Sequence, residues 1–165
     1  MREILFRGKR KDKPTEWVYG YLIGSFTPSS DAEIQTWITE GYYKTHYEVI
    51  PETVGQLTLL NDKNEKGIWE GDIVKFHYFY QSLGANLGAQ ESEHELVGVI
   101  KMMQYGWGVS AIKGQHWQGY TGYDAGEGES SIVDLYCMNE SSLHEESFDI
   151  IGDIYTTPEL LNPIK

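Results

Sequence analysis

The sequence has a single cysteine, Cys137, and no long hydrophobic run. One thiol excludes an intrachain disulfide and a structural zinc site built from several thiolates, and it suits a reducing compartment. No apolar stretch approaches the roughly 18 residues of a membrane-spanning helix, so we expect no membrane partner. Residues 1–8 lack the apolar core and cleavage site of a secretory signal. These absences favour a cytoplasmic protein.

Positive charge is scarce and unevenly placed. The net charge is −12, yet residues 1–14 contain six Lys or Arg against two acids, which is a local charge of +4. The remainder therefore carries −16, and residues 114–164 contain ten acidic residues without any Lys or Arg. Nucleic-acid affinity depends on neutralising phosphates with cations, so we expect no non-specific nucleic-acid binding.

The chain is rich in tyrosine and glycine. Twelve Tyr and eighteen Gly occur among 165 residues, and hydrophobic residues make up 40 %. Such a composition argues against disorder and favours short strands joined by tight turns. The length fits one domain over residues 1–165. We therefore expect an all-β, or at least β-dominated, fold.

Residues 49–76 show the clearest pattern. Apolar runs at 54–60 and 68–69 flank a polar run at 61–67, whose Asn, Asp and Gly residues favour a turn. Glu70, Gly71 and Asp72 then precede the alternating residues 73–76. Gly supplies backbone freedom and Asp hydrogen-bonds nearby amides, so this triplet is typical of a turn that starts a strand.

The other segments follow the same rules. We expect strands near 3–7, 17–26, 33–39, 42–50, 73–80, 96–104, 108–113 and 148–155. Residues 81–95 and 114–131 lose apolar periodicity and are predicted to be insert-like surface loops. Residues 141–146 and the segment after Thr157-Pro158-Glu159 favour short helices. Residues 132–138 fit either a short strand or a helix.

Several blocks resemble the YopX-like family of phage and prophage proteins. The central block reads Val-Ile-Pro-Glu-Thr-Val-Gly-Gln at 49–56, Asp-Lys-Asn at 62–64 and Ile-Trp-Glu-Gly-Asp-Ile-Val at 68–74. Flanking blocks at 6–9, 17–22 and 148–161 agree. The resemblance implies a mostly-β protein of phages and prophages without an assigned biochemical activity.

One departure from the family pattern concerns the predicted turn. The family usually reads Asp-Lys-Asn-Gly, whereas this chain has Glu65 after Asn64 and its glycine only at Gly67. The turn geometry at Asn64 is therefore open. For the whole chain we expect a small antiparallel β-barrel, or paired SH3-like barrels, with short helices that include one near the C-terminus.

Catalytic and metal sites have little support. The run from Asp62 to Gly67 begins like a calcium loop, but Lys66 and Ile73 stand where oxygen ligands are needed. The five histidines lack metal-ligand spacing. We expect no metal, no cofactor and no catalytic residue. The alternative is a carboxylate-dependent hydrolase, with or without a divalent ion, that uses Glu70 and Asp72.

Protein–protein contact is the remaining class. The candidate interface combines basic residues of the N-terminal hairpin with aromatic residues of glycine-rich segments, namely Arg7, Lys9, Arg10, Lys11, Trp107, Trp117, Tyr120 and Tyr123. We expect a non-enzymatic interaction or assembly module, either a homo-oligomer or the partner of a phage or host protein. A further alternative is an acidic DNA mimic that occupies a host nucleic-acid-binding protein.

Overall fold

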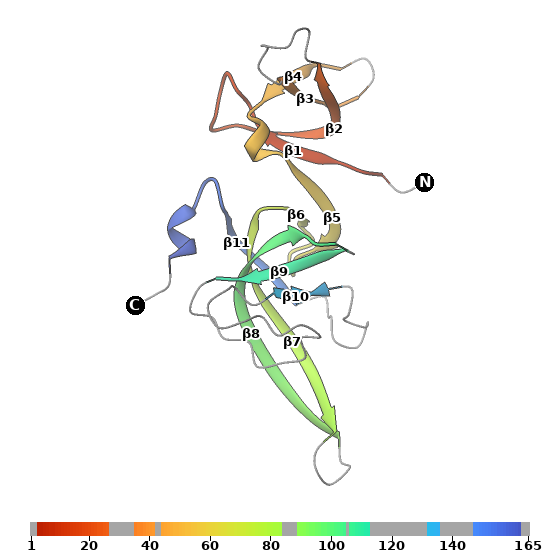
Figure 1. Cartoon of the computed structure of the whole chain (residues 1–165), viewed down its shortest axis with the longest axis vertical. Helices are drawn as coiled ribbons and strands as arrows, with labels where there is room; N and C mark the ends of the chain where they lie inside the picture. Colours follow the sequence, from red (N-terminus) through yellow and green to blue (C-terminus); the bar gives the residue numbers. More distant parts are fainter. Residues whose placement is uncertain are drawn as a thin grey trace. The chain divides into compact units, whose positions relative to one another are not determined.

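The computed structural model describes residues 3–26, 35–41, 44–83, 89–104, 106–112, 132–135 and 147–162. These residues form two antiparallel sheets (Figure 1), which confirms the expected all-β class. The chain divides into two compact units, Met1–Leu57 and Thr58–Lys165. Within the described part of the chain neither sheet closes, so the expected barrel is wrong.

The first unit contains β1 (Phe6–Lys9), β2 (Trp17–Phe26), β3 (Gln35–Thr39), β4 (His46–Val49) and the 3-10 helix η1 (Pro51–Thr53). β5 (Gly55–Asn61) begins here and continues into the second unit. The sheet has the order β4-β3-β2-β1-β5-β6. An isolated antiparallel bridge between Arg10 and Val49 pairs the end of β4 with the residue after β1. A single bridge does not form a ladder, which is why the sheet stays open.

Alternation along the strands separates an inner and an outer side of this unit. The inner side holds a small core of Val18, Ile38 and Val49, against which Phe6, Tyr47 and Val54 pack. Gly8 lies on the same side. A Cβ at Gly8 would lie 3.0 Å from the Val49 Cβ, so glycine permits β1 to approach β4 this closely.

The second unit contains β6 (Gly67–Trp69), β7 (Asp72–Leu83), β8 (Ala89–Met102), β9 (Trp107–Ala111), β10 (Ile132–Asp134), β11 (Phe148–Asp153) and the 3-10 helix η3 (Pro158–Leu161). Its sheet has the order β10-β9-β8-β7-β11. The helix expected after Thr157 is thus a single 3-10 segment with Pro158 in its first turn. The segments expected at 114–131 and 141–146 lie outside the described residues.

The predicted loop at 81–95 is wrong. β7 continues to Leu83 and β8 begins at Ala89, so both sides of this segment are strands in one hairpin. Glu91-Ser-Glu-His-Glu95 has no apolar face, and hydrophobic periodicity therefore gave no strand signal there. Backbone pairing with β7 makes it a strand.

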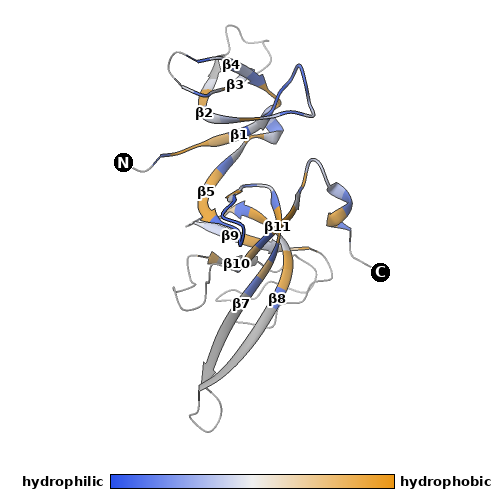
Figure 2. Cartoon of the chain, turned by 180° about the vertical axis from the view of Figure 1, so that it is seen from behind, coloured by the Kyte–Doolittle hydropathy of each residue, from blue (hydrophilic) through white to orange (hydrophobic). Residues whose placement is uncertain are grey.

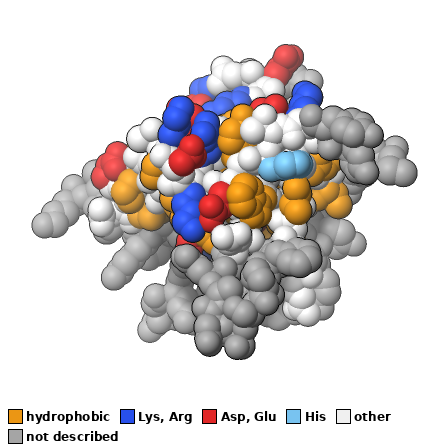
Figure 3. Space-filling model, turned by 90° about the horizontal axis from the view of Figure 1, so that it is seen from above, with side chains coloured by type: hydrophobic (Ala, Val, Ile, Leu, Met, Phe, Trp, Pro, Cys, Tyr) orange, Lys and Arg blue, Asp and Glu red, His pale blue; other side chains and the backbone are white. Residues whose placement is uncertain are grey.

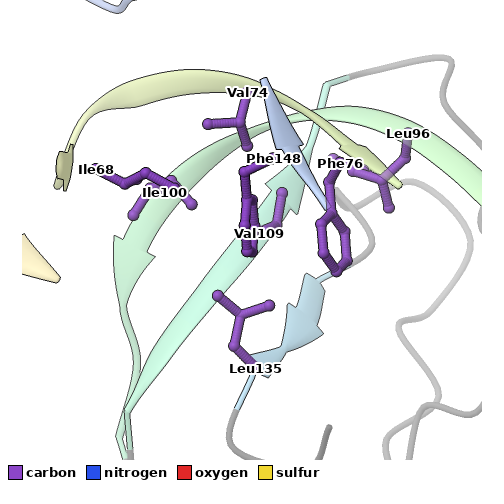
Figure 4. Close-up of a cluster of buried hydrophobic side chains, with 9 residues drawn as sticks. Ile68, Val74, Phe76, Leu96, Ile100, Val109, Leu135 and Phe148 are labelled. Carbon is purple, nitrogen blue, oxygen red and sulfur yellow. The ribbon is translucent and has the colours of Figure 1, made fainter. Parts of the chain in front are cut away.

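The main core lies in the second unit. Side chains from β6, β7, β8, β9, β11 and the residue after β10 meet in one cluster of Ile68, Val74, Phe76, Leu96, Ile100, Val109, Ala111, Leu135 and Phe148. Eight of them are labelled in Figure 4. Ile73, Val99 and Ile112 form a separate cluster that η3 covers with Leu160 and Leu161. β7 is therefore buried on both faces at its start, where the adjacent Ile73 and Val74 enter different clusters. Figure 2 shows this hydrophobic colouring in the body of the unit.

The β5–β6 turn settles the geometry that the sequence left open at Asn64. The carboxylate of Asp62 accepts hydrogen bonds from the backbone N–H of Asn64 at 2.8 Å and of Lys66 at 2.9 Å. Between them Glu65 has φ of 61°, in the left-handed region. The strained position is therefore Glu65, the place where the family usually has glycine, rather than Asn64.

We expect Glu65→Gly to raise the free energy of unfolding by about 1 kcal/mol, because a side chain in the left-handed region costs about 1–2 kcal/mol and glycine returns part of this as chain entropy. Urea denaturation at pH 7 measures the change. Lys66→Gly is the matched control in the same turn, and we expect it to destabilise. A loss of stability in both variants would contradict the interpretation that the backbone at Glu65 is strained.

Candidate functional site

The turn Glu70-Gly71-Asp72 joins three strands of the second unit. Asp72 is 2 % exposed, and its carboxylate accepts a hydrogen bond from the Trp69 N–H at 2.8 Å. Gly71 has φ of 83°, donates its N–H to the Ile100 carbonyl at 2.9 Å and accepts from the Ile154 N–H at 3.0 Å. The turn thus connects β6 and β7 to the end of β8 and to the segment after β11.

The second Gly-Asp pair lies beside the first. Asp153 is directly opposite Asp72 in the β7–β11 ladder. Its carboxylate accepts hydrogen bonds from the N–H groups of Tyr155 at 2.9 Å and Thr156 at 2.8 Å. Each acid therefore supports its own turn. This geometry offers structural hydrogen bonds and supplies no support for the hydrolase alternative that uses Glu70 and Asp72.

The described ranges contain no cluster of side chains that could bind a metal ion. In that part of the chain no group of three or more His, Cys, Asp or Glu side chains is placed to hold a metal ion. The run from Asp62 to Gly67 is the turn described above, where the Asp62 carboxylate accepts hydrogen bonds from backbone and side-chain N–H groups.

Buried hydrogen bonding also sets the charge state of Asp62. Burial by itself raises the pKa of this carboxyl, since it disfavours the charged form. Hydrogen bonds from the backbone of Lys66 and from the backbone and side chain of Asn64 lower the pKa and prevail, so it lies below its ordinary value. Asp62 is thus held as a carboxylate inside the turn.

The most chemically distinct surface lies on the first unit, and we call it the outer face. It consists of residues that share the outer side of neighbouring strands, namely Arg7 and Lys9 on β1, Trp17, Tyr19, Tyr21 and Ile23 on β2, and Trp37 on β3. The ladder pairs Arg7 with Tyr19, Lys9 with Trp17 and Ile23 with Trp37. Residues directly opposite in an antiparallel ladder share a side of the sheet.

Aromatic rings and cations contact one another across the outer face. The Arg7 guanidinium lies 4.6 Å from the centre of the Trp17 ring, and the Lys9 ammonium lies 5.5 Å from it. Both distances are within the range of cation–π attraction. Tyr19 is 49 % exposed and Ile23 is 40 % exposed. The face therefore presents large apolar side chains to solvent beside the half-buried Lys9, while Arg7 is buried.

The basic hairpin beside this face is internally paired. Arg10 contacts Asp12 at 2.6 Å and Glu16 at 3.0 Å, and it lies 4.7 Å from the Tyr47 ring centre. Its hydrogen bond to Asp12 raises the pKa of Arg10 and lowers that of Asp12. Lys11 contacts Glu48 at 2.8 Å. Much of the local positive charge is thus compensated, and Figure 3 shows basic, acidic and hydrophobic side chains intermixed.

A cavity of about 450 Å³ adjoins this hairpin, within the range typical of ligand pockets. Its lining includes Arg10, Lys11, Trp37, His46 and Tyr47. The cations here are those already paired with acids, so the site has no uncompensated charge that would select one class of small molecule.

The predicted interface residues fall into separate groups. Arg7 is buried, Lys9 and Arg10 are half-buried, and Lys11 is exposed, all in the first unit. Trp107 packs against the main core of the second unit. Trp117, Tyr120 and Tyr123 lie outside the described residues.

The prediction left out the exposed side chains of β2. Residues 17–24 carry large apolar side chains at both odd and even positions, and the two glycines, Gly20 and Gly24, occupy only even positions. This pattern indicates a strand with large apolar side chains on both sides. The small core of the first unit can cover only one of these sides. It was the available signal for Tyr19, Tyr21 and Ile23.

The described residues contain no helix that is long and apolar enough to cross a membrane. A search of curated proteins found no match. A family model with the description YopX protein matches residues 5–162, which is nearly the whole chain and includes every block singled out above. The chain belongs to the YopX family.

Proposed function

We propose that this protein is a non-enzymatic interaction module of phage or prophage origin that works in the bacterial cytoplasm by protein–protein contact, as a homo-oligomer. The observation that carries the proposal is the outer face of the first unit. Exposed Tyr19, Tyr21 and Ile23 lie beside Arg7 and Lys9 on one side of one sheet. Aromatic residues and Arg are enriched at protein interfaces, and contiguous exposed apolar surface marks such sites.

Charge favours an acidic partner surface. The second unit, Thr58–Lys165, contains seventeen acidic and six basic residues, a net charge of −11. The outer face of one copy therefore complements the second unit of another. Such a head-to-tail contact closes into a ring if the rotation between copies permits.

The apolar part of the face supplies most of the expected binding energy. Burying a large apolar side chain contributes about 1.5–3 kcal/mol, whereas a surface ion pair contributes about 0–1 kcal/mol. Arg10 and Lys11 are already paired with acids of their own unit. We therefore expect the basic hairpin to orient the partner and Tyr19 and Ile23 to hold it.

Light scattering coupled to size exclusion tests the proposal at tens of micromolar protein. We expect an oligomer for the wild type, partial dissociation at 1 M salt, and loss of this salt-sensitive association in Tyr19→Ser/Ile23→Ser. Charge reversal of Lys9, Arg10 and Lys11 to Glu should weaken it. Exposed charges are screened over about 3 Å at 1 M salt, which is why salt acts on the charged part.

The matched control reverses three cations elsewhere, Lys44, Lys66 and Lys101, with the same change in net charge. All three are exposed. We expect this control to remain oligomeric at low salt. A wild type that is monomeric in every condition, or equal dissociation of both triple variants, would contradict the proposed contact.

A further inference from the structure

The β7–β8 hairpin extends beyond the sheet that supports it. Its ladder runs from Ile73 opposite Val99 to Leu83 opposite Ala89. β11 pairs with β7 only as far as Phe76, and β9 pairs with β8 only from Gly98 onward. Residues 78–83 and 89–95 therefore form a two-stranded arm, which Figure 1 shows projecting from the second unit. Among the residues that the structure describes, no third strand pairs with this arm.

The two strands of the arm differ in charge. Residues 78–83, Tyr-Phe-Tyr-Gln-Ser-Leu, contain no charged side chain. The opposite strand contains Glu91, Glu93 and Glu95 within five residues. Charged residues on an edge strand discourage pairing with another chain, whereas an uncharged aromatic edge invites it. The β8 edge is thus protected and the β7 edge is not.

An isolated two-stranded ribbon is marginally stable in water, and a third strand stabilises it. We propose that the β7 edge of the arm pairs antiparallel with the same strand of a second copy about a two-fold axis, which gives the order β8-β7-β7′-β8′. The same residues serve on both sides of such a contact, as an isologous interface requires.

The charge distribution selects this pairing over the alternative. In the proposed order the two glutamate-bearing strands lie three strand spacings apart, roughly 14 Å, which exceeds the screening length of about 8–10 Å at physiological salt. Pairing through β8 would place Glu91 and Glu93 of both copies on adjacent strands about 5 Å apart. Glu95 is compensated by Lys75, whose ammonium lies 2.9 Å from its carboxylate. The proposed contact through β7 does not involve the outer face of the first unit.

The test introduces two lysines on either strand of the arm. Tyr80→Lys/Ser82→Lys places them on β7, and Ser92→Lys/Gln90→Lys places the same charges at the positions directly opposite on β8. We measure self-association by analytical ultracentrifugation at 1 M salt, where the head-to-tail contact is weakened, and in the Tyr19→Ser/Ile23→Ser background, which removes it. Circular dichroism of both variants checks that the fold is retained.

We expect a dimer that persists at 1 M salt and in that background, because its seam is uncharged. The β7 variant should raise the dissociation constant at least about tenfold, and the β8 variant should leave it within about twofold. A salt-resistant dimer that responds equally to both variants would overturn the assignment to β7. Absence of any dimer in the Tyr19→Ser/Ile23→Ser background would overturn the arm contact and leave the outer-face proposal to its own test.

Discussion

Phe76→Ala is expected to lower the free energy of unfolding of the second unit by about 3–5 kcal/mol. The Phe76 side chain is fully buried, and its ring stacks on that of Phe148 with centroids 4.8 Å apart. Side chains from four other strands, β6, β8, β9 and β11, belong to the same cluster, so the cavity left by alanine would collapse only in part. A loss of this size is a large fraction of the total stability of a typical domain, about 5–15 kcal/mol.

Urea denaturation monitored by circular dichroism measures this loss. Ile151→Ala is the matched control, since Ile151 is on the adjacent strand β11 and is 39 % exposed. We expect the control to cost less than about 1 kcal/mol. Comparable losses in the two variants would show that the cluster around Phe76 is not the core of the unit.

Asp62→Asn is expected to lower the free energy of unfolding by about 1.5–3 kcal/mol at pH 7, because a buried carboxylate that accepts several N–H groups is replaced by an amide. The pKa of Asp62 is depressed in the folded state. Its contribution to stability is therefore fully present above the unfolded pKa of about 3.9, and it is lost as the pH falls through the lower folded pKa. The difference in the free energy of unfolding between wild type and variant should stay constant above about pH 5 and decrease toward zero at lower pH.

Denaturation series from pH 7 to the acid limit of folding measure this difference. Asp12→Asn is the control, because the pKa of Asp12 is also lowered, by its hydrogen bond to Arg10, but this carboxylate is exposed. We expect a much smaller effect from the control. An Asp62 difference that persisted unchanged below the folded pKa would contradict the role of its charge.

Local chemistry made the turns predictable. Asp62 and Asp72 accept hydrogen bonds from amides within four residues of themselves, so the sequence around each contains the signal for its turn. The strand starts at β7 and β11 follow for the same reason. The apolar runs of β7 and β9 were visible because burial against a sheet leaves a pattern in the strand itself.

Pairing between distant segments was not predictable. The strand character of residues 89–95 comes from β7, since its own glutamates and serine carry no apolar alternation. Barrel closure likewise depends on backbone pairing between β1 and β4, far apart in sequence, and this pairing is a single isolated bridge. Hydrophobic patterning in the sequence predicts neither the strand at residues 89–95 nor the open edge of the first sheet.

The amino-acid sequence by itself determined the all-β class, the positions of the main turns and membership of the YopX family, because each depends on short-range patterns. Tertiary structure decided the state of the basic hairpin. As a sequence, residues 7–13 contain five cations and a single acid, Asp12. In the folded chain Glu48, 37 residues from Lys11, lies 2.8 Å from its ammonium group, and Tyr47 stacks under Arg10. The packing of β4 against the end of β1 thus pairs cations of the basic hairpin with acidic and aromatic side chains. The exposed aromatic side of β2 is therefore the distinctive surface of the first unit.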